Sequence, residues 1–405
     1  MKDFTTISLF KIPGFYLKGV SFSSDLKEIN FFVKQRRKTA DCPFCFKRTR
    51  FLYGHRKERK VLHRLLGNQR IYLSFNPRRF KCQKCQKVFV ESFSFLRKKS
   101  RQTEDLLSDL LYELRTQCFS TIKEKTGVGY QALRKYLLRR LSPFLSNWEE
   151  EENQEKISLG IDEHHFKKQR FVTTITNLTS RRLKTILPSD RKSQVMDYLK
   201  SLPLKIKEKI IEVCCDMDSG YIRAVYETLP YASLVIDPFH VIQDANRRLN
   251  EARILEQEAT GKKLNWKVFL KGKEHLNRQR EEDKLLEKYL KSYPYLNTFY
   301  HYKEALREMY KLKTKKEAEE KLTQMIILMK ATDIIELKQW AKTLNNYKKE
   351  ILNHFDNRTT NGYTEGLNVK LKMIQRVSFG FRNLDVYIRK AMLAILPLAL
   401  IYNTY

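Results

Sequence analysis

The chain has 405 residues, more than one domain usually holds, so we expect two to four modules with a sizeable core. It carries 79 Lys and Arg against 46 Asp and Glu, a formal net charge of +33. Solubility does not need so large an excess, which predicts a polyanionic partner, most naturally nucleic acid. The first 100 residues alone carry 25 basic and 6 acidic side chains, so we expect the main electrostatic contact there.

Seven cysteines, an odd number, argue against a disulfide framework in a chain without a secretion signal. Residues 1–18 lack the continuous apolar core of a signal peptide. Residues 391–402 are apolar but too few to span a bilayer, and Pro397 interrupts them, so a buried helix is expected. We therefore expect a cytoplasmic, nucleoid-associated protein without a membrane segment.

Residues 5–35 alternate apolar and polar side chains and predict short strands. Two cysteine pairs follow, Cys42-Pro-Phe-Cys45 and Cys82-Gln-Lys-Cys85. Each pair can present two thiolates to one tetrahedral Zn²⁺. The connection between the pairs is long, so it needs a hairpin of its own, and alternating apolar residues from Ile71 to Phe75 fit a strand there. Four buried reduced cysteines are the alternative, but the paired spacing favours zinc.

Basic side chains interleaved with aromatic ones surround the cysteine pairs, a mixture that fits a zinc ribbon lying on phosphates. A face that only needed solvation would carry more acids. The residues that we expect to contact DNA in this region are Arg36, Arg37, Arg78 and Arg79.

The next segment has helical character and begins with a stripe of leucines at 3.6-residue spacing. A short helix then includes Ile122, Gly127-Val128 makes a turn, and a second helix follows. This is helix-turn-helix spacing, in which polar residues early in the second helix contact base edges. Helical hairpins are common without DNA, but the positive charge favours DNA binding. The outward polar residues of the second helix are Gln131, Arg134 and Lys135.

An alternating strand, residues 157–161, leads to Asp162, and a second buried strand leads to Asp216. Three strands, a helix, then strand–helix–strand is the order of an RNase H-like sheet, in which the first and fourth strands are neighbours. Asp162 and Asp216 would then lie side by side and could hold two divalent metals about 3.5–4 Å apart, as phosphoryl transfer requires. Magnesium suits such oxygen ligands. The remaining predicted elements are strands 170–177, 182–187 and 232–236 and a helix at 193–202.

Residues 245–358 contain two glycines and one proline and are dense in Lys, Glu and Leu, which predicts a long helical insertion. Trp266 and Trp340 within it could stack on bases. A tryptophan on a helix more often lies in the core, and we favour that interpretation.

The chain resembles a bacterial insertion-sequence DDE transposase, most closely the IS-L-three family, over nearly its whole length. The resemblance rests on the cysteine pairs, the helix-turn-helix segment and three strings: Gly160-Ile-Asp-Glu163, Asp237-Pro-Phe-His240, and Thr359-Thr-Asn-Gly-Tyr-Thr-Glu365-Gly-Leu-Asn with Gly380-Phe-Arg-Asn383 after it. It implies that Glu365 is the third catalytic acid. Asp237 and His240 would support the metal ligands without binding metal. Asp218 is a rival to Asp216, but Asp216 matches the family position.

Lys372 and Arg376 lie 7 and 11 positions after Glu365, so all three share one face of a predicted helix. That face would offer a carboxylate to the metal and two cations to the adjacent phosphates. A merely solvated charged face is the alternative.

The resemblance implies a DNA transposase that binds terminal inverted repeats, cleaves phosphodiester bonds and joins 3′-hydroxyl ends to target DNA. Asp162, Asp216 and Glu365 would bind two Mg²⁺ or Mn²⁺ ions, and two-ended chemistry implies a homodimer or a higher assembly on DNA. A non-catalytic DNA-binding regulator and an RNase H-like nuclease that does not join ends remain alternatives.

The expected fold class is α/β, with an RNase H-like catalytic domain, a long all-α insertion, and a zinc ribbon and helix-turn-helix domain in front. The expected boundaries are 1–100 for the zinc ribbon, 101–145 for the helix-turn-helix domain, 146–156 for a linker, 157–244 and 359–405 for the catalytic domain, and 245–358 for the insertion.

Overall fold

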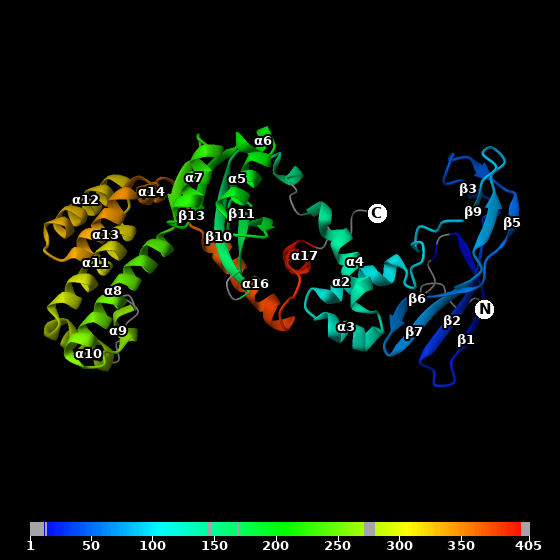
Figure 1. Ribbon diagram of the computed structural model, residues 1–405, viewed down its shortest axis with the longest axis horizontal. Helices are drawn as coiled ribbons and strands as arrows, with labels where there is room; N and C mark the ends of the chain where they lie inside the picture. The colour runs from blue at the N-terminus through cyan, green and yellow to red at the C-terminus, as the bar shows by residue number, and fades with distance from the viewer. Residues whose placement is uncertain (1–11, 13, 145–147, 168–169, 271–279, 398–405) are drawn as a thin grey trace. The chain divides into compact units, whose positions relative to one another are not determined.

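The computed structural model describes residues 12, 14–144, 148–167, 170–270 and 280–397, and its contacts divide the chain into two compact units (Figure 1). Of the strands predicted over 5–35, the part before residue 12 lies outside the described residues. Unit 1 comprises residues 1–142, 374–394 and 401–405, and unit 2 comprises 143–373 and 395–400.

A four-stranded sheet of order β1-β2-β7-β6 forms the first core of unit 1. Strands β2 and β7 run parallel, and the other neighbours run antiparallel. Ile71, Leu73 and Phe75 of β7 are at most 2% exposed, which confirms the strand predicted there. The strands are β1 (Phe15–Phe22), β2 (Glu28–Gln35), β6 (Arg59–Leu66) and β7 (Gln69–Phe75).

Two small β-structures carry the cysteine pairs. Cys42 and Cys45 lie between β3 and β4, and Cys82 and Cys85 lie between β8 and β9. Phe80 and Phe89 stack with ring centroids 6.2 Å apart and, with the cysteines, form a small core of their own. The strands are β3 (Ala40–Asp41), β4 (Arg48–Thr49), β5 (Leu52–His55), β8 (Arg78–Lys81) and β9 (Val88–Val90).

Three helices follow in unit 1. Thr103 caps the first of them, its Oγ1 accepting a hydrogen bond from the Leu106 amide at 3.4 Å. The leucines of the predicted stripe are all buried on this helix. Gly127 ends the second helix at φ +74°, a left-handed conformation that glycine adopts without steric cost. The helices are α2 (Glu104–Leu114), α3 (Phe119–Thr126) and α4 (Tyr130–Leu141).

The C-terminal helix α17 (Leu384–Ile395) also packs in unit 1. Its Lys390 is fully buried, and the ammonium donates to the Gln117 carbonyl at 2.7 Å. Sequence analysis assigned residues 359–405 to the catalytic domain, whereas the structure groups 374–394 with unit 1. An apolar helix face shows that a helix is covered but not by which partner, so the sequence pattern does not define this boundary.

The sheet of unit 2 has the order β12-β11-β10-β13-β14, which confirms the predicted RNase H-like arrangement with the first and fourth strands adjacent. Strands β12, β11 and β10 form an antiparallel meander. Strand β13 pairs in parallel with β10, and β14 pairs in parallel with β13. The elements are β10 (Ile157–Lys167), β11 (Arg170–Asn177), β12 (Arg182–Leu187), α5 (Lys192–Ser201), α6 (Leu204–Lys207), β13 (Ile210–Cys215), α7 (Ser219–Thr228) and β14 (Ser233–Ile236).

The segment before β10 differs from the linker predicted over 146–156. Trp148 and Glu151 are buried, and the Glu151 carboxylate meets the ammonium of Lys184 on β12 at 2.6 Å. That ammonium also lies 4.4 Å from the Trp148 ring centroid. An acid of the predicted linker thus neutralises a buried lysine. Two short 3-10 turns, Ser142–Phe144 and Glu149–Glu151, flank the undescribed residues 145–147.

The predicted helical insertion is present and has its own apolar core. Trp340 is completely buried there, as expected, whereas Trp266 is 50% exposed and does not belong to the core. Among the described residues, no helix is both long and apolar enough to cross a membrane. The helices are α8 (Pro238–Thr260), α9 (Trp266–Leu270), α10 (Arg280–Ser292), α11 (Pro294–Lys311), α12 (Lys315–Ala331), α13 (Ile335–Asn346), α14 (Lys348–Leu352) and α15 (His354–Asn357), and α16 (Gly362–Val377) returns to the sheet.

Candidate functional site

Strand β10 places Asp162 at the centre of the unit 2 sheet. Ile157, Leu159 and Ile161 are completely buried against the layer of α5 and α7, so Asp162 faces the other side by strand alternation. The strand was predicted to end at Asp162, but it continues to Lys167 because its antiparallel pairing with β11 extends that far. Its parallel pairing with β13 ends earlier, at Gly160 and Cys214, so Asp162 lies where the neighbouring strand has stopped.

Asp216 follows β13 directly and occupies the equivalent position on the neighbouring strand. Its Oδ1 accepts a hydrogen bond from the Met217 amide at 2.5 Å. Asp218 has a different task, because its Oδ1 accepts the Gly220 and Tyr221 amides at 2.7 and 3.2 Å and caps helix α7. A capping carboxylate is committed to its helix, so the geometry favours Asp216 as the second acid.

His240 lies among all three predicted acids. It sits in the first turn of α8, which begins at Asp237 and Pro238 directly after β14. Its Nδ1 is 3.3 Å from Asp216 Oδ1, and its Nε2 is 3.9 Å both from Asp162 Oδ1 and from Glu365 Oε1. The imidazole is therefore in direct reach of the carboxylates, and whether it supports the metal ligands or binds a metal stays a prediction.

Helix α16 brings Glu365 to the sheet from nearly 200 residues away. The Asn361 side chain donates to the Ile161 carbonyl at 2.9 Å, and the Asn361 amide donates to Asp237 Oδ1 at 3.3 Å. One turn later, the Thr364 hydroxyl meets the Thr176 hydroxyl of β11 at 2.7 Å. These contacts fix the helix against β10 and β11 and hold Glu365 beside Asp237 and His240.

Sequence analysis missed Asn368, which contacts Asp162 directly. Its Nδ2 donates to Asp162 Oδ2 at 2.8 Å, and its Oδ1 accepts from the Thr174 hydroxyl at 2.8 Å. The Thr174 hydroxyl also lies 3.2 Å from His164 Nδ1. All four side chains are buried. The available signal was a polar residue on the buried stripe of helix α16, opposite the threonines of β11.

Two of the acids, Asp162 and Glu365, have raised pKa values. Burial raises the pKa of Asp162, against the opposing effect of His240. Burial also raises the pKa of Glu365 to about 8, with a further contribution from the adjacent Asp237 carboxyl and from the charge of Asp162. Crowded carboxylates are the arrangement that a divalent cation relieves.

The residues present fit a metal ion. Among the described residues, Asp237, His240 and Glu365 can place one ligand atom each within 4.8 Å of the others. Asp237 Oδ2, Glu365 Oε1 and His240 Nε2 are buried and have no hydrogen-bond partner, so each has a lone pair or a proton left over. The two carboxylate oxygens suit Mg²⁺ or Mn²⁺, whereas an imidazole nitrogen is a ligand for transition metals.

Helix α16 also carries the two cations that the sequence predicted beside Glu365. Lys372 and Arg376 are both exposed. Lys372 lies near His164, and its charge adds to burial in lowering the pKa of that imidazole to about 4. Their predicted contact with phosphates therefore stays a prediction.

Gly160 is the point at which α16 approaches the sheet most closely. A Cβ there would lie 2.4 Å from Asn361 Oδ1 and from Thr364 Oγ1, and 2.7 Å from Thr176 Oγ1. Gly160→Ala should therefore lower the free energy of unfolding by about 1–3 kcal/mol and displace Glu365, which urea titration and a cleavage assay would measure. Gly366→Ala is the matched control, because its Cβ meets nothing within 4 Å. Equal stability and activity in both variants would contradict the close approach.

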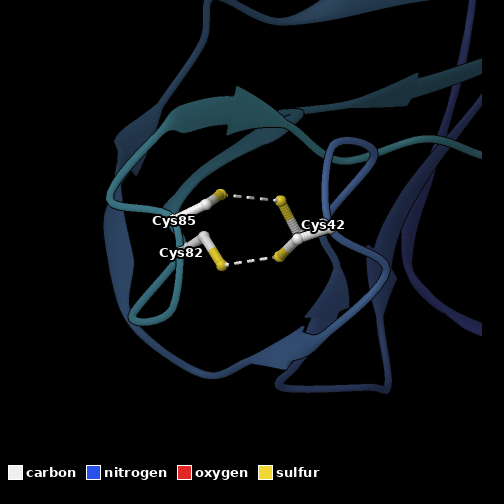
Figure 2. A group of neighbouring side chains, drawn as sticks. Cys42, Cys82 and Cys85 are labelled. Atoms are coloured by element: carbon white, nitrogen blue, oxygen red, sulfur yellow. Dashed lines mark hydrogen bonds between the residues drawn. The ribbon is translucent and has the colours of Figure 1, made fainter.

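The four predicted zinc ligands converge in unit 1 (Figure 2). Cys42 Sγ lies 3.6 Å from Cys85 Sγ, and Cys45 Sγ lies 3.5 Å from Cys82 Sγ. Tetrahedral Zn–S bonds of about 2.3 Å would place the sulfurs ~3.8 Å apart, so the cluster fits one zinc ion. All four are free thiols.

Both cysteine turns have the same backbone geometry. The residue after the second cysteine, Phe46 or Gln86, adopts a left-handed conformation with φ 58° or 60°. Its amide donates to the carbonyl of the first cysteine at 2.9 Å in each turn. Two matching turns that face each other are what a four-cysteine site requires.

The residues predicted to contact DNA differ in their exposure and in the contacts that their side chains already make. Arg78 is largely buried, and its guanidinium meets the Glu91 carboxylate at 2.6 Å. Arg79 lies over the ring of Tyr53, with 5.0 Å to the centroid. Arg36 and Arg37 are exposed, as are Gln131 and Lys135 on α4, whereas Arg134 is half-buried. Arg79 is thus a better test of phosphate contact than Arg78.

Comparison with known proteins places the chain among transposases. A family model described as a transposase, that of the ISL3 DDE group, matches residues 159–391. The transposase of insertion sequence element IS1001 from Bordetella parapertussis is 22% identical over 390 residues, 93% of this chain and 94% of that protein. The transposase of IS1557 from Mycobacterium tuberculosis is 25% identical over 266 residues, 58% of this chain and 60% of that protein.

A solved structure of the Drosophila P element transposase strand transfer complex aligns with a TM-score of 0.37 and 10% identity, over 73% of this chain and 92% of that one. Similarity at that level supports no conclusion. The family model, by contrast, covers more than half of the chain and includes all three predicted acids. The chain belongs to the ISL3 (IS-L-three) family of DDE transposases.

Proposed function

We propose that this transposase binds the terminal inverted repeats of its insertion sequence, cleaves the phosphodiester bond at each end, and joins the 3′-hydroxyl to target DNA. One observation carries the proposal: Asp162, Asp216 and Glu365, from two adjacent strands and a distant helix, all lie within 3.9 Å of the His240 ring. Carboxylates gathered around one point repel one another unless a cation lies among them.

The three acids would hold two Mg²⁺ or Mn²⁺ ions, which supply an activated water or 3′-hydroxyl and a stabilised leaving oxygen. The chain's own residues set the geometry. Asp162 and Asp216 present oxygens from neighbouring strand positions, and Glu365 faces them from α16. Asn368 holds Asp162 Oδ2, so Oδ1 stays directed toward His240. Asp237 and His240 offer further donor atoms at the same point.

DNA recognition is assigned to unit 1. The cysteine cluster would hold a structural Zn²⁺, and helices α3 and α4, joined through Gly127, have helix-turn-helix spacing. The exposed early residues of α4 would contact base edges, and the ribbon arginines would contact phosphates. Chemistry on two ends implies a homodimer or a higher assembly on DNA.

The deciding experiment incubates the protein with DNA that carries the element's termini and Mg²⁺. Cleavage at the element boundary, followed by joining to a second duplex, is the expected result. Cleavage without joining would indicate a nuclease. Binding without either reaction, in Mg²⁺ and in Mn²⁺, would indicate a regulator and overturn the proposal.

Base contacts from α4 and phosphate contacts from the ribbon arginines should respond differently to mutation. Arg134→Ala should relax discrimination between the terminal repeat and random DNA by about 1–3 kcal/mol. Arg79→Ala should weaken binding to both about equally, because phosphate contacts carry no sequence information. Fluorescence anisotropy on both duplexes measures this. If Arg134→Ala weakens both equally, α4 is not the recognition helix.

A further inference from the structure

A cleft of about 700 Å³ lies within unit 1, between the segment that precedes α2 and the side of α4. One wall carries Arg97, Lys98, Lys99 and Arg101, and the other carries Lys135 and Arg139. Leu107 and Tyr136, both buried, lie at its base. Six cations therefore line a hollow in which Glu104 is the one acid among the lining residues.

Ion pairs account for only two of these cations. The Glu104 carboxylate meets Arg97 at 3.1 Å and Arg139 at 2.6 Å, one residue from each wall. Glu104 thus ties the two walls together. In the part of the chain that the structure describes, the other four cations, Lys98, Lys99, Arg101 and Lys135, form no ion pair, and all four are exposed.

The wall before α2 is held in place by its backbone. The Ser100 amide donates to the Arg97 carbonyl at 3.0 Å and closes a turn around the two lysines. The Leu62 amide of β6 donates to the Arg101 carbonyl at 2.9 Å, and the Thr103 amide donates back to the Leu62 carbonyl at 3.0 Å. The backbone of the segment is therefore fastened to the sheet before any ligand arrives, which lowers the ordering cost of binding.

We propose that this cleft binds the sugar-phosphate backbone of duplex DNA. The inference rests on the proposed function, in that the protein must bind DNA at all. Cations that lack carboxylate partners and converge from two fixed walls match a strand of phosphodiesters. Lys135 belongs to both surfaces, because it lies on α4 one turn after Gln131, on the exposed face predicted to contact bases. The cleft thus holds the backbone beside the groove that α4 enters.

The test compares two variants that each lose two charges. Lys98→Gln/Lys99→Gln removes cations from the cleft, and Lys18→Gln/Lys34→Gln removes exposed cations from β1 and β2 of the same unit. Binding of the full-length protein to terminal-repeat and random duplexes is measured over a range of salt concentrations. Circular dichroism and zinc content confirm that both variants are folded.

The cleft variant should lose about tenfold or more in affinity at 0.1 M salt, equally for both duplexes, and the slope of log K against log salt should become shallower by about 1.8. The control should change little. Equal losses in the two variants would overturn the cleft and leave general electrostatic attraction. A loss restricted to the terminal repeat would also overturn it, because it would indicate base contact. If the unmodified protein binds neither duplex, the proposed function fails first.

Discussion

Removal of zinc is expected to unfold the cysteine ribbon and to abolish DNA binding while the catalytic sheet stays folded. The ribbon core consists of Ala40, Phe80, Phe89 and the cysteines, too few apolar side chains to order the segment alone. Structural zinc contributes about 10–16 kcal/mol of apparent binding free energy in small domains, which is folding free energy. The core of the unit 2 sheet shares no residue with the ribbon core, so its stability should not depend on the metal.

The change to make is Cys82→Ser, and the matched control is Cys118→Ser. Cys118 is also buried, but it precedes α3 and lies outside the cluster. Metal analysis should find one zinc per chain in the unmodified protein and in the control, and a large loss in Cys82→Ser. Hydrogen exchange should then show loss of protection over β3, β4, β5, β8 and β9, with the unit 2 sheet still protected. An unmodified protein without zinc, or a Cys82→Ser variant with full zinc, would refute the assignment.

The sheet elements could be predicted because each strand carries its own signal. The strands predicted at 170–177 and 182–187 agree with β11 and β12 residue for residue, and the buried strand predicted to lead to Asp216 is β13. A buried strand between short polar connections begins and ends where the apolar run does, so its boundaries can be predicted from the sequence. The adjacency of Asp162 and Asp216 then followed from strand order alone, since parallel neighbours end at one edge of a sheet.

The remaining features depend on contacts between distant residues, which no local pattern reveals. Asn368 contacts Asp162 across 206 positions, and Lys390 of α17 contacts Gln117 across 273 positions. Glu151 lies in the predicted linker, and its partner, Lys184, is on strand β12. In each case a polar side chain is buried, and only its partner explains why.

The largest loss of activity is expected from the three acids. Asp162→Asn, Asp216→Asn and Glu365→Gln should each reduce cleavage and joining by at least about a thousandfold, because acids that act as one unit fail together. Binding to the terminal repeat should be unchanged or tighter, since affinity comes from phosphate contacts elsewhere and a negative charge near the DNA has been removed. Single-turnover cleavage and anisotropy measure the two effects separately.

Asp218→Asn is the control that the structure offers, because asparagine can still accept the Gly220 and Tyr221 amides and cap α7. Asp218→Asn should retain substantial activity, whereas Asp216→Asn, two residues earlier in the chain, should have almost none. An active Asp216→Asn beside an inactive Asp218→Asn would move the second ligand without changing the class of enzyme. Asp162→Asn cutting at the unmodified rate in Mg²⁺ would reject the triad. Equal loss of binding and cleavage would instead show that Asp162 supports the fold through Asn368, because only a structural role lowers both together.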